Sequence, residues 1–304
     1  MRYPSGDFGD RLTAANRRTG TVLCMGIDPH AAMIPSIFGT ATATAGSDTA
    51  IRAIDDFVMA CLETAIDRVA AIKPQAAFFE QQGPAGMALL QRLGRAAIDA
   101  GMLVIMDAKR GDIGSTSTAY AAGWIGHDAP FPSDALTINP WLGIDTLQPF
   151  LDRADATGSG LFILNRTSNP GAADLQDKQV DGIPLYTHLA KMLAPLAAAR
   201  TGTTGISSLG IVAGATWPEE ARALRADLPA SPFLVPGFGA QGAGPDKATS
   251  GLIRTQNGWT GGLVNSTRGL IFPQTAATVT SIAAWRTTII ETIAANSAAL
   301  NSAL

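Results

Sequence analysis

Residues 103–116 read LVIMDAKRGDIGST and place four charged side chains directly after an apolar run. Positions 103–106 are all apolar, which is typical of a strand buried on both faces of a parallel sheet. On an extended chain Asp107 and Lys109 are two residues apart, so both side chains leave the same face. A carboxylate beside an ammonium at the end of a buried strand indicates a chemical site, although a solvated charge cluster that closes a strand has the same composition. The four charged residues are Asp107, Lys109, Arg110 and Asp112.

These side chains need a sheet to position them, and the rest of the sequence predicts one. Eight apolar runs of strand type alternate with segments whose apolar residues recur at helical spacing. This alternation predicts an α/β protein, a single (β/α)8 TIM barrel. A doubly wound open sheet is the main alternative, but eight units suit a closed barrel better and no GxGxxG follows the first strand. The predicted strands are 21–28, 70–80, 103–107, 135–140, 160–166, 209–215, 233–239 and 261–268, and the predicted helices between them are 51–69, 84–100, 115–125, 144–154, 184–200 and 218–227.

Two terminal helices and one loop complete the predicted organisation. Residues 7–19 form an amphipathic helix suited to cover one end of the barrel, and the Ala/Thr-rich residues 273–298 form a long C-terminal helix. Residues 171–183 are a long polar loop after the fifth strand and a candidate lid. We expect residues 1–304 to form one domain, with both terminal helices packed on the barrel.

The composition excludes several classes of protein. Hydrophobic residues make up 46% and charged residues 15% of the 304 positions, which provides a large core and argues against disorder. A net charge of −3 gives no basic field for nucleic acid. No apolar run approaches the roughly 18 residues that a membrane span needs. The N-terminus lacks the apolar core of a signal peptide.

Cysteine and histidine usage gives no sign of a metal site. Cys24 and Cys61 are the only cysteines, and without CxxC or another metal-ligand spacing we expect buried free thiols in a reducing cytosol. The three histidines, His30, His127 and His188, form no recognisable pair or triad. The sequence therefore predicts a cytoplasmic protein without a bound metal.

Polar residues gather at the ends of the predicted strands, where the active sites of such barrels lie. Two of the five lysines of the chain, Lys73 and Lys109, belong to this set, and surface solubility does not explain that concentration. The whole set is Asp28, Lys73, Asp107, Lys109, Asn139, Asn165, Arg166, Ser168, Pro236, Gln241 and Arg268.

A phosphate site is indicated after the last two strands. Residues 236–244 (PGFGAQGAG) form a glycine-rich loop that can present backbone N–H groups to an anion, although turns also favour glycine. Arg268 follows the eighth strand. Because the loops after strands seven and eight are the usual phosphate site of this fold, the loop and the arginine together predict phosphate binding.

Several motifs at these strand ends resemble one family. DAKRGDIGST resembles the D-x-K-x-x-D-I-x-x-T signature of the orotidine 5′-phosphate decarboxylases. The resemblance continues in GIDP, IKPQAAFFE, TINPWLGIDTLQPF, NRTSNPG, VPGFGAQGAG and NSTRGLIF, and so covers the strand ends from about residue 20 to about residue 270. The IKPQ and RTSNPG segments resemble the longer, type 2-like subgroup of that family.

The resemblance implies a catalytic role for four residues. Lys109 would be the catalytic acid, and Asp107 and Lys73 would form a charged network with it. Asp112 would complete this network from the neighbouring subunit of a homodimer with shared active sites. No cofactor would take part.

The resemblance also implies how the substrate, orotidine 5′-phosphate, is held. Asp28 would bind the ribose together with Lys73 and with Thr116 of the partner chain. Ser168 would contact the pyrimidine, and Gln241 would bridge the base and the phosphate. Arg268 would bind the phosphate, and a turn at Pro236 and Gly237 would frame the site.

The implied reaction explains why lysine and aspartate are needed. Removal of CO₂ from C6 of the orotate ring leaves a carbanion in the ring plane, which the π system stabilises poorly. Because the sequence shows no apparatus for pyridoxal phosphate, thiamine or a metal, electrostatics must do most of the work. An ammonium held against C6 stabilises the developing charge and donates the proton that replaces CO₂. Lysine suits this role because its charge is compact, and flanking carboxylates favour its charged form.

Two alternatives remain open at this stage. A Mg²⁺-dependent sugar-phosphate aldolase or decarboxylase of the same barrel suprafamily also uses a D-x-K-x-x-D strand, but it carries an acidic metal ligand where this chain has Lys73. A non-catalytic module that binds a phosphate ligand would have no reason to retain Lys73 and Lys109 in a carboxylate network. We expect a small nucleotide as the substrate, and neither nucleic acid nor a membrane as a partner.

Overall fold

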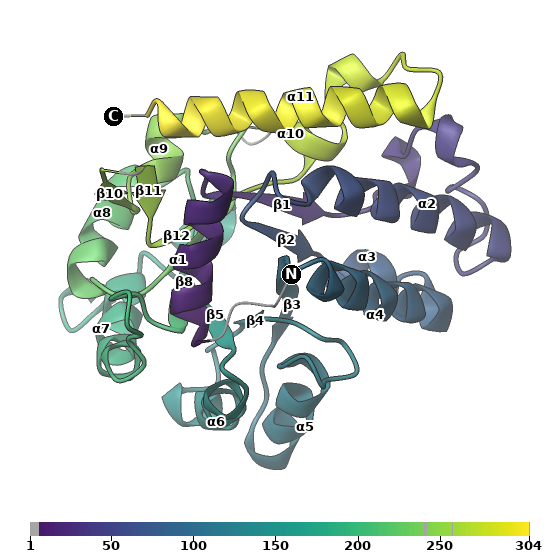
Figure 1. Cartoon of the computed structure of the whole chain (residues 1–304). Coiled ribbons are helices and arrows are strands. Elements are labelled where there is room, and N and C mark those ends of the chain that lie inside the picture. The colour runs from purple at the N-terminus through teal and green to yellow at the C-terminus, as the bar shows by residue number, and fades with distance from the viewer. Residues whose placement is uncertain (1–5, 240–241, 257, 304) are drawn as a thin grey trace.

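A closed barrel of eight parallel strands forms the centre of the molecule (Figure 1). The computed structural model describes residues 6–239, 242–256 and 258–303. Around the barrel the strand order is β1-β12-β9-β8-β5-β4-β3-β2, so the first and last strands in the sequence are neighbours. The predicted TIM barrel is therefore confirmed. Its strands are β1 (Leu23–Ile27), β2 (Ala71–Pro74), β3 (Leu103–Arg110), β4 (Ala135–Ile138), β5 (Gly160–Arg166), β8 (Leu209–Ala213), β9 (Phe233–Val235) and β12 (Gly262–Ser266).

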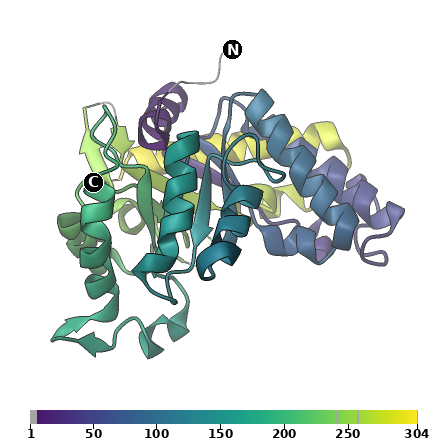
Figure 2. The ribbon, with the colours of Figure 1, turned by 90° about the horizontal axis from the view of Figure 1, so that it is seen from below.

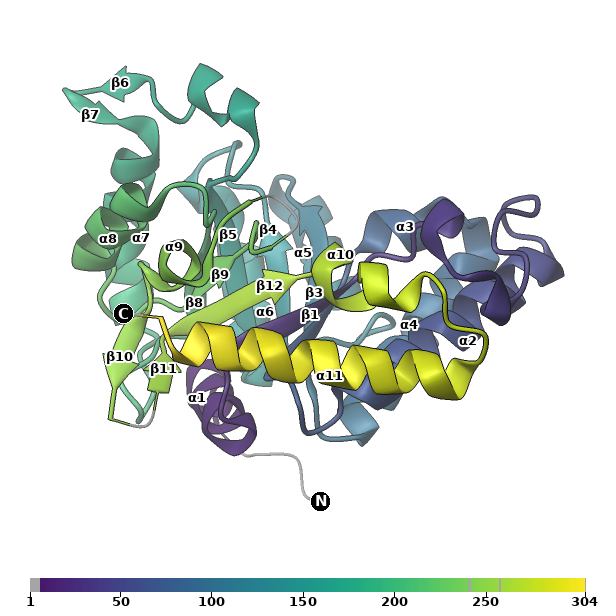
Figure 3. The same ribbon diagram turned by 90° about the horizontal axis from the view of Figure 1, so that it is seen from above.

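Helices cover the outside of the barrel, because each parallel strand needs a crossover connection to the next (Figure 1). Serine side chains cap two of them: Ser47 accepts from the N–H of Ala50, and Ser281 accepts from the N–H of Ala284. The helix that follows Ser281 crosses the outside of the barrel and packs against α2 (Figure 3). The longer helices are α2 (Asp48–Ala65), α4 (Gly83–Asp99), α5 (Gly114–Trp124), α6 (Gln148–Thr157), α7 (Leu185–Ala198), α8 (Pro218–Asp227) and α11 (Ile282–Asn301).

Helix α1 (Phe8–Thr19) closes the end of the barrel at which the strands begin. Phe8 is fully buried and meets Phe162 of β5 edge to face, with the ring centroids 5.7 Å apart. Arg11 forms a buried ion pair with Asp134, which directly precedes β4. Helix α1 does not cover the opposite end of the barrel, where the strands finish and a cavity opens.

The predicted second strand is too long. Strand β2 ends at Pro74, and Ala76–Glu80 is a short helix, α3. One further ladder bond follows, from the N–H of Gln75 to the carbonyl of Ile27 at 3.2 Å, and after it the chain bonds locally, with the N–H of Gln81 donating to the carbonyl of Ala77. The predicted C-terminal helix also begins later than expected, at Ile282. Before it lie α10 (Arg268–Ile271) and a 3₁₀ turn at Gln274–Ala276.

Two short hairpins were not predicted. Within the polar loop 171–183 and just after it, β6 (Gln179–Val180) pairs with β7 (Ile183–Pro184). Figure 2 and Figure 3 show that this hairpin projects from the barrel. The second hairpin joins β10 (Ile253–Thr255) to β11 (Gly258–Thr260). None of the helices in the described residues has the length and hydropathy required to cross a membrane.

Candidate active site

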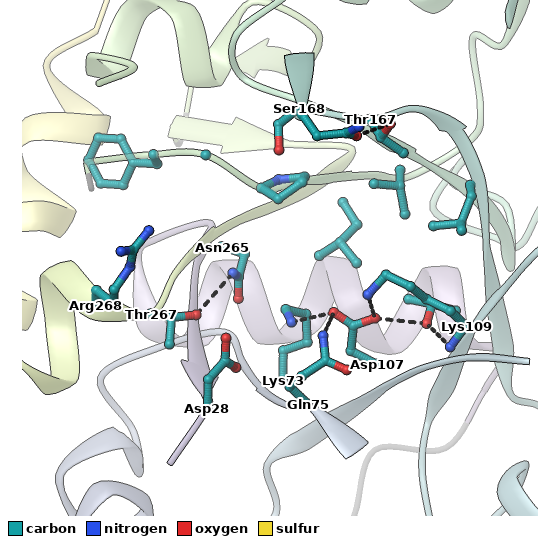
Figure 4. Close-up of a pocket in the computed structure, with 18 of the residues that line it drawn as sticks. Asp28, Lys73, Gln75, Asp107, Lys109, Thr167, Ser168, Asn265, Thr267 and Arg268 are labelled. Atoms are coloured by element: carbon teal, nitrogen blue, oxygen red, sulfur yellow. Dashed lines mark hydrogen bonds and ion pairs between the residues drawn. The ribbon is translucent and has the colours of Figure 1, made fainter. Parts of the chain in front are cut away.

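A cavity of about 510 Å³ lies at the end of the barrel where the strands finish. Its wall consists mainly of side chains at the last positions of the strands or just after them, from β1 round to β12 (Figure 4). Eight of the predicted site residues line it: Asp28, Lys73, Asp107, Lys109, Ser168, Pro236, Gly237 and Arg268.

Asp107 holds two ammonium groups in this cavity. Lys73 Nζ lies 2.6 Å from one carboxylate oxygen, and Lys109 Nζ lies 2.6 Å from the other. Gln75 also donates to the carboxylate, from Nε2 at 3.1 Å. Lys73 and Asp107 are buried, whereas the side chain of Lys109 is 47% exposed. Both lysines line the cavity, and Lys109 is the more exposed cation of this network.

Burial and charge oppose each other in the network. Desolvation raises the pKa of the Asp107 carboxyl, but Lys73 and Lys109 outweigh it and hold that pKa well below its usual range. Desolvation lowers the pKa of Lys73, but Asp107 and Asp28 raise it above its usual value. The pKa of Asp28 is raised by its own burial, against the opposing effect of Lys73. Lys73 and Asp107 thus remain charged at neutral pH and present fixed charges to the cavity.

The backbone at Lys109 is strained and is held by a neighbouring side chain. Met106 pairs with Leu136 and Arg110 with Ile138, so β3 has two extra residues between these pairs, and Lys109 adopts a φ of +48°. Thr137 lies opposite the irregularity. Its Oγ1 accepts from the N–H of Lys109 at 2.9 Å and donates to Asp107 at 3.0 Å. Thr137 was not among the predicted site residues, and its only signal in the sequence is a hydroxyl group within an otherwise apolar run.

The predicted phosphate residues lie together at one side of the cavity. Arg268 begins α10 directly after β12, and Pro236 and Gly237 follow β9. Gly237 has a φ of +104°, a conformation that other residues rarely adopt. Gln241, the predicted bridge between base and phosphate, lies outside the described residues.

The segment that carries Ser168 is held by contacts of the neighbouring residues Arg166 and Thr167 with Trp217. Arg166 is 1% exposed, and its guanidinium carbon lies 4.0 Å from the ring centroid of Trp217. The same guanidinium lies 3.0 Å from Asp177 of the polar loop. Trp217 Nε1 also donates to the carbonyl of Thr167 at 2.9 Å. Arg166 was expected at the strand ends, and it supports the Ser168 segment without lining the cavity.

Other predicted residues lie away from the cavity lining. Asp112 and Thr116 occupy the loop after β3 and the first turn of α5, and Thr116 is exposed. Asn139 accepts a hydrogen bond from the N–H of Trp141 at 3.0 Å. Asn165 is buried at 2% exposure and does not line the cavity.

Four of the other polar lining residues lie in or beside motifs that the sequence had already singled out. Gln75 follows β2, and Asn265 and Thr267 lie at the end of β12. His30 also lines the cavity and packs its ring against Phe78 with the centroids 4.2 Å apart. The motifs IKPQ and NSTR contain the first three residues and His30 directly follows GIDP, but spacing alone does not tell which of these side chains face inward.

Comparison with known proteins places most of the chain in one family. Residues 21–272 match the model of the orotidine 5′-phosphate decarboxylase / HUMPS family. An orotidine 5′-phosphate decarboxylase of Rhodopirellula baltica is 42% identical over 269 residues, which is 87% of this chain and 88% of that protein. Another, of Streptomyces coelicolor, is 44% identical over 240 residues, or 78% of this chain and 81% of the relative.

A solved structure extends the comparison to three dimensions. The OMP decarboxylase of Leishmania donovani superimposes with a TM-score of 0.71 at 31% sequence identity, covering 96% of this chain and 99% of that one. The match covers the barrel and the strand ends that carry the cavity. On sequence and fold together, this chain belongs to the orotidine 5′-phosphate decarboxylase / HUMPS family.

Proposed function

We propose that this protein is a carboxy-lyase that converts orotidine 5′-phosphate into uridine 5′-phosphate, a step of pyrimidine biosynthesis. The observation that carries the proposal is the Lys73–Asp107–Lys109 network, with its exposed Lys109 ammonium, in the same cavity as Arg268. A nucleotide monophosphate has its anion and its reacting ring at opposite ends, which matches this separation of charges.

Lys109 carries the chemical step. The bond between C6 and the carboxylate breaks, CO₂ leaves, and the electron pair stays on C6. The ammonium of Lys109 stabilises this charge and then gives a proton to C6, after which the neutral amine takes a proton from solvent. Asp107 and Lys73 orient Lys109 and need not gain or lose a proton themselves. Asp107 also faces the substrate carboxylate as a like charge.

The remaining predicted residues position the substrate. Arg268 binds the phosphate beside the turn formed by Pro236 and Gly237, and the role proposed for Gln241 is to bridge the phosphate and the base. Asp28 and Lys73 bind the ribose. Ser168 contacts the pyrimidine, a role supported by the contacts of Arg166 and Trp217 behind its segment.

We propose further that the enzyme is a cytoplasmic homodimer in which each cavity receives Asp112 and Thr116 from the partner chain. In one chain these two residues lie outside the cavity lining. Next to them Ile113 is 61% exposed, and near the same end of the barrel Trp141 is 65% exposed. Large apolar side chains exposed beside a cavity support a partner surface there.

A subunit-mixing experiment tests the shared cavity. Lys109→Ala and Asp112→Ala homodimers should each be nearly inactive, because every site lacks one group. After subunit exchange about half of the dimers are mixed, and each mixed dimer has one site with both defects and one intact site. Activity should therefore recover to roughly a quarter of that of the unaltered protein.

The matched control places both changes in one chain. The double variant is then allowed to exchange subunits with an equal amount of unaltered protein. Relative to the same total amount of unaltered protein, a shared site predicts that activity falls from about half before exchange to about a quarter after it. If Asp112 acts within its own chain, the control stays at about half and the first mixture recovers nothing. Native mass spectrometry confirms that exchange has occurred.

One assay separates the proposed activity from its two alternatives. We expect loss of the ultraviolet absorbance of orotidine 5′-phosphate at the same rate with and without EDTA. Activity that the chelator abolishes would support a metal-dependent aldolase or decarboxylase, and binding without turnover would support a non-catalytic module. Lys73 favours equal activity with and without EDTA, because its ammonium lies 2.6 Å from Asp107 and so opposes a divalent cation there.

A further inference from the structure

Asn265 lines the cavity but belongs to none of the roles described above. It lies on β12 next to the final residue of the strand and is 7% exposed. Side chains alternate along the strand, with Leu263 in the barrel interior and Val264 in the outer core. Asn265 therefore points inward and Ser266 outward.

A glycine on the neighbouring strand makes room for this amide. In the register between β1 and β12, Cys24 pairs with Asn265 and Met25 with Ser266, which places Gly26 beside Thr267. A Cβ at Gly26 would lie 1.9 Å from Thr267 Oγ1 and 3.1 Å from Asn265 Oδ1. Without that Cβ, the side chains of Asn265 and Thr267 lie over Gly26, next to Asp28 two residues further along.

Two buried oxygens at this place have no hydrogen-bond partner among the described residues. Asn265 Nδ2 lies 3.5 Å from Thr267 Oγ1, but its Oδ1 is unpaired, and so is Oδ1 of Asp28. In Figure 4 the Asn265 oxygen is turned toward the side chains of Asp28 and Lys73. A buried acceptor without a partner is unfavourable, so both oxygens are free to accept hydrogen bonds from a bound ligand.

We infer that Asn265 is a substrate-binding residue that hydrogen-bonds a ribose hydroxyl of the nucleotide together with Asp28. This inference rests on the proposed function, which places the phosphate at Arg268 and the base at Ser168. The sugar connects these two groups, and in Figure 4 Asn265 and Asp28 lie between Arg268 and Lys73. A ribose offers two hydroxyl donors, and the site offers two unpaired acceptors. Asn265 thus contributes to selection of ribonucleotides over deoxyribonucleotides.

Calorimetric binding of the product and two analogues tests this contact. Uridine 5′-phosphate, its 2′-deoxy form and its 3′-deoxy form are titrated into the unaltered protein, Asn265→Leu and the control Ser266→Ala. Leucine has a similar size but no hydrogen-bonding group, and Ser266 lies on the same strand with its side chain on the other face. We expect Asn265→Leu to weaken binding of the ribonucleotide about tenfold, the effect of one lost hydrogen bond. Ser266→Ala should leave all three affinities within about twofold.

The deciding result is the coupling between the variant and one analogue. In the unaltered protein, loss of the relevant hydroxyl should weaken binding about tenfold, and in Asn265→Leu the same loss should have almost no effect. Additive losses for both analogues would overturn the inference while leaving the proposed function intact. Failure of the unaltered protein to bind uridine 5′-phosphate would instead overturn the proposed function and the inference with it. Asn265→Ala repeats the measurement if leucine does not fit.

Discussion

Replacing Lys109 with alanine should lower kcat by about 10⁴-fold or more in a protein that remains folded. A positioned general acid contributes about 10²–10⁴-fold, and stabilisation of the developing carbanion by the same ammonium adds to this. The side chain of Lys109 is 47% exposed, and Asp107 keeps its second partner, Lys73, at 2.6 Å, so the loss should leave the core unchanged. Single-turnover kinetics with orotidine 5′-phosphate measure the effect directly.

Two controls make this result specific. Lys191→Ala removes an exposed lysine on α7 and should leave kcat unchanged. Binding of uridine 5′-phosphate to the Lys109 variant should persist, because a group needed mainly in the transition state contributes little to product affinity. A Lys109→Ala protein that keeps a tenth of the original kcat would show that another group donates the proton.

Arg268→Ala should lower kcat/KM for orotidine 5′-phosphate by about 10²-fold or more, which corresponds to about 3 kcal/mol of transition-state stabilisation. Arg268 lines the cavity directly after β12, at the side opposite the Lys109 network. Binding energy at a remote, non-reacting phosphate can be used to position the ring against Lys109 and to close loops over it.

The phosphate-free nucleoside provides the internal control. Its slow turnover should be almost the same in Arg268→Ala and in the unaltered protein, because it has no phosphate for the guanidinium to bind. Equal losses with both substrates would mean that Arg268 supports the fold of the cavity wall. Thermal unfolding of both proteins then checks that conclusion.

The barrel and its polar end could be predicted from the sequence because both follow from local pattern. Runs such as 103–106 are apolar on every residue, since parallel barrel strands are covered on both faces. Charged and polar residues begin where such runs stop, and all barrel strands stop at the same end. This is enough to bring Lys73, Asp107 and Lys109 into one predicted site.

Element boundaries depended on interactions that the local pattern does not contain. Residues 70–80 were predicted as one strand, yet the ladder stops after Gln75 and Ala76–Glu80 forms the helix α3. The C-terminal helix begins only after its N-cap residue, Ser281, although residues from 273 onward have a similar composition. At the C-terminal helix a single side-chain hydrogen bond, from the N–H of Ala284 to Ser281, marks where the element begins.

Only the tertiary structure decided which polar residues reach the cavity. Asn165 and Arg166 end a strand as Asp28 does, but neither lines the cavity, whereas Thr137 and Asn265 do. The difference is set by register between strands that are far apart in the sequence, because a shift of one residue moves a side chain to the other face. Closure of the barrel places β12 beside β1 and so brings Asn265 next to Asp28. The sequence by itself determined the fold and the chemical groups, and the pairing of distant strands determined how those groups face one another.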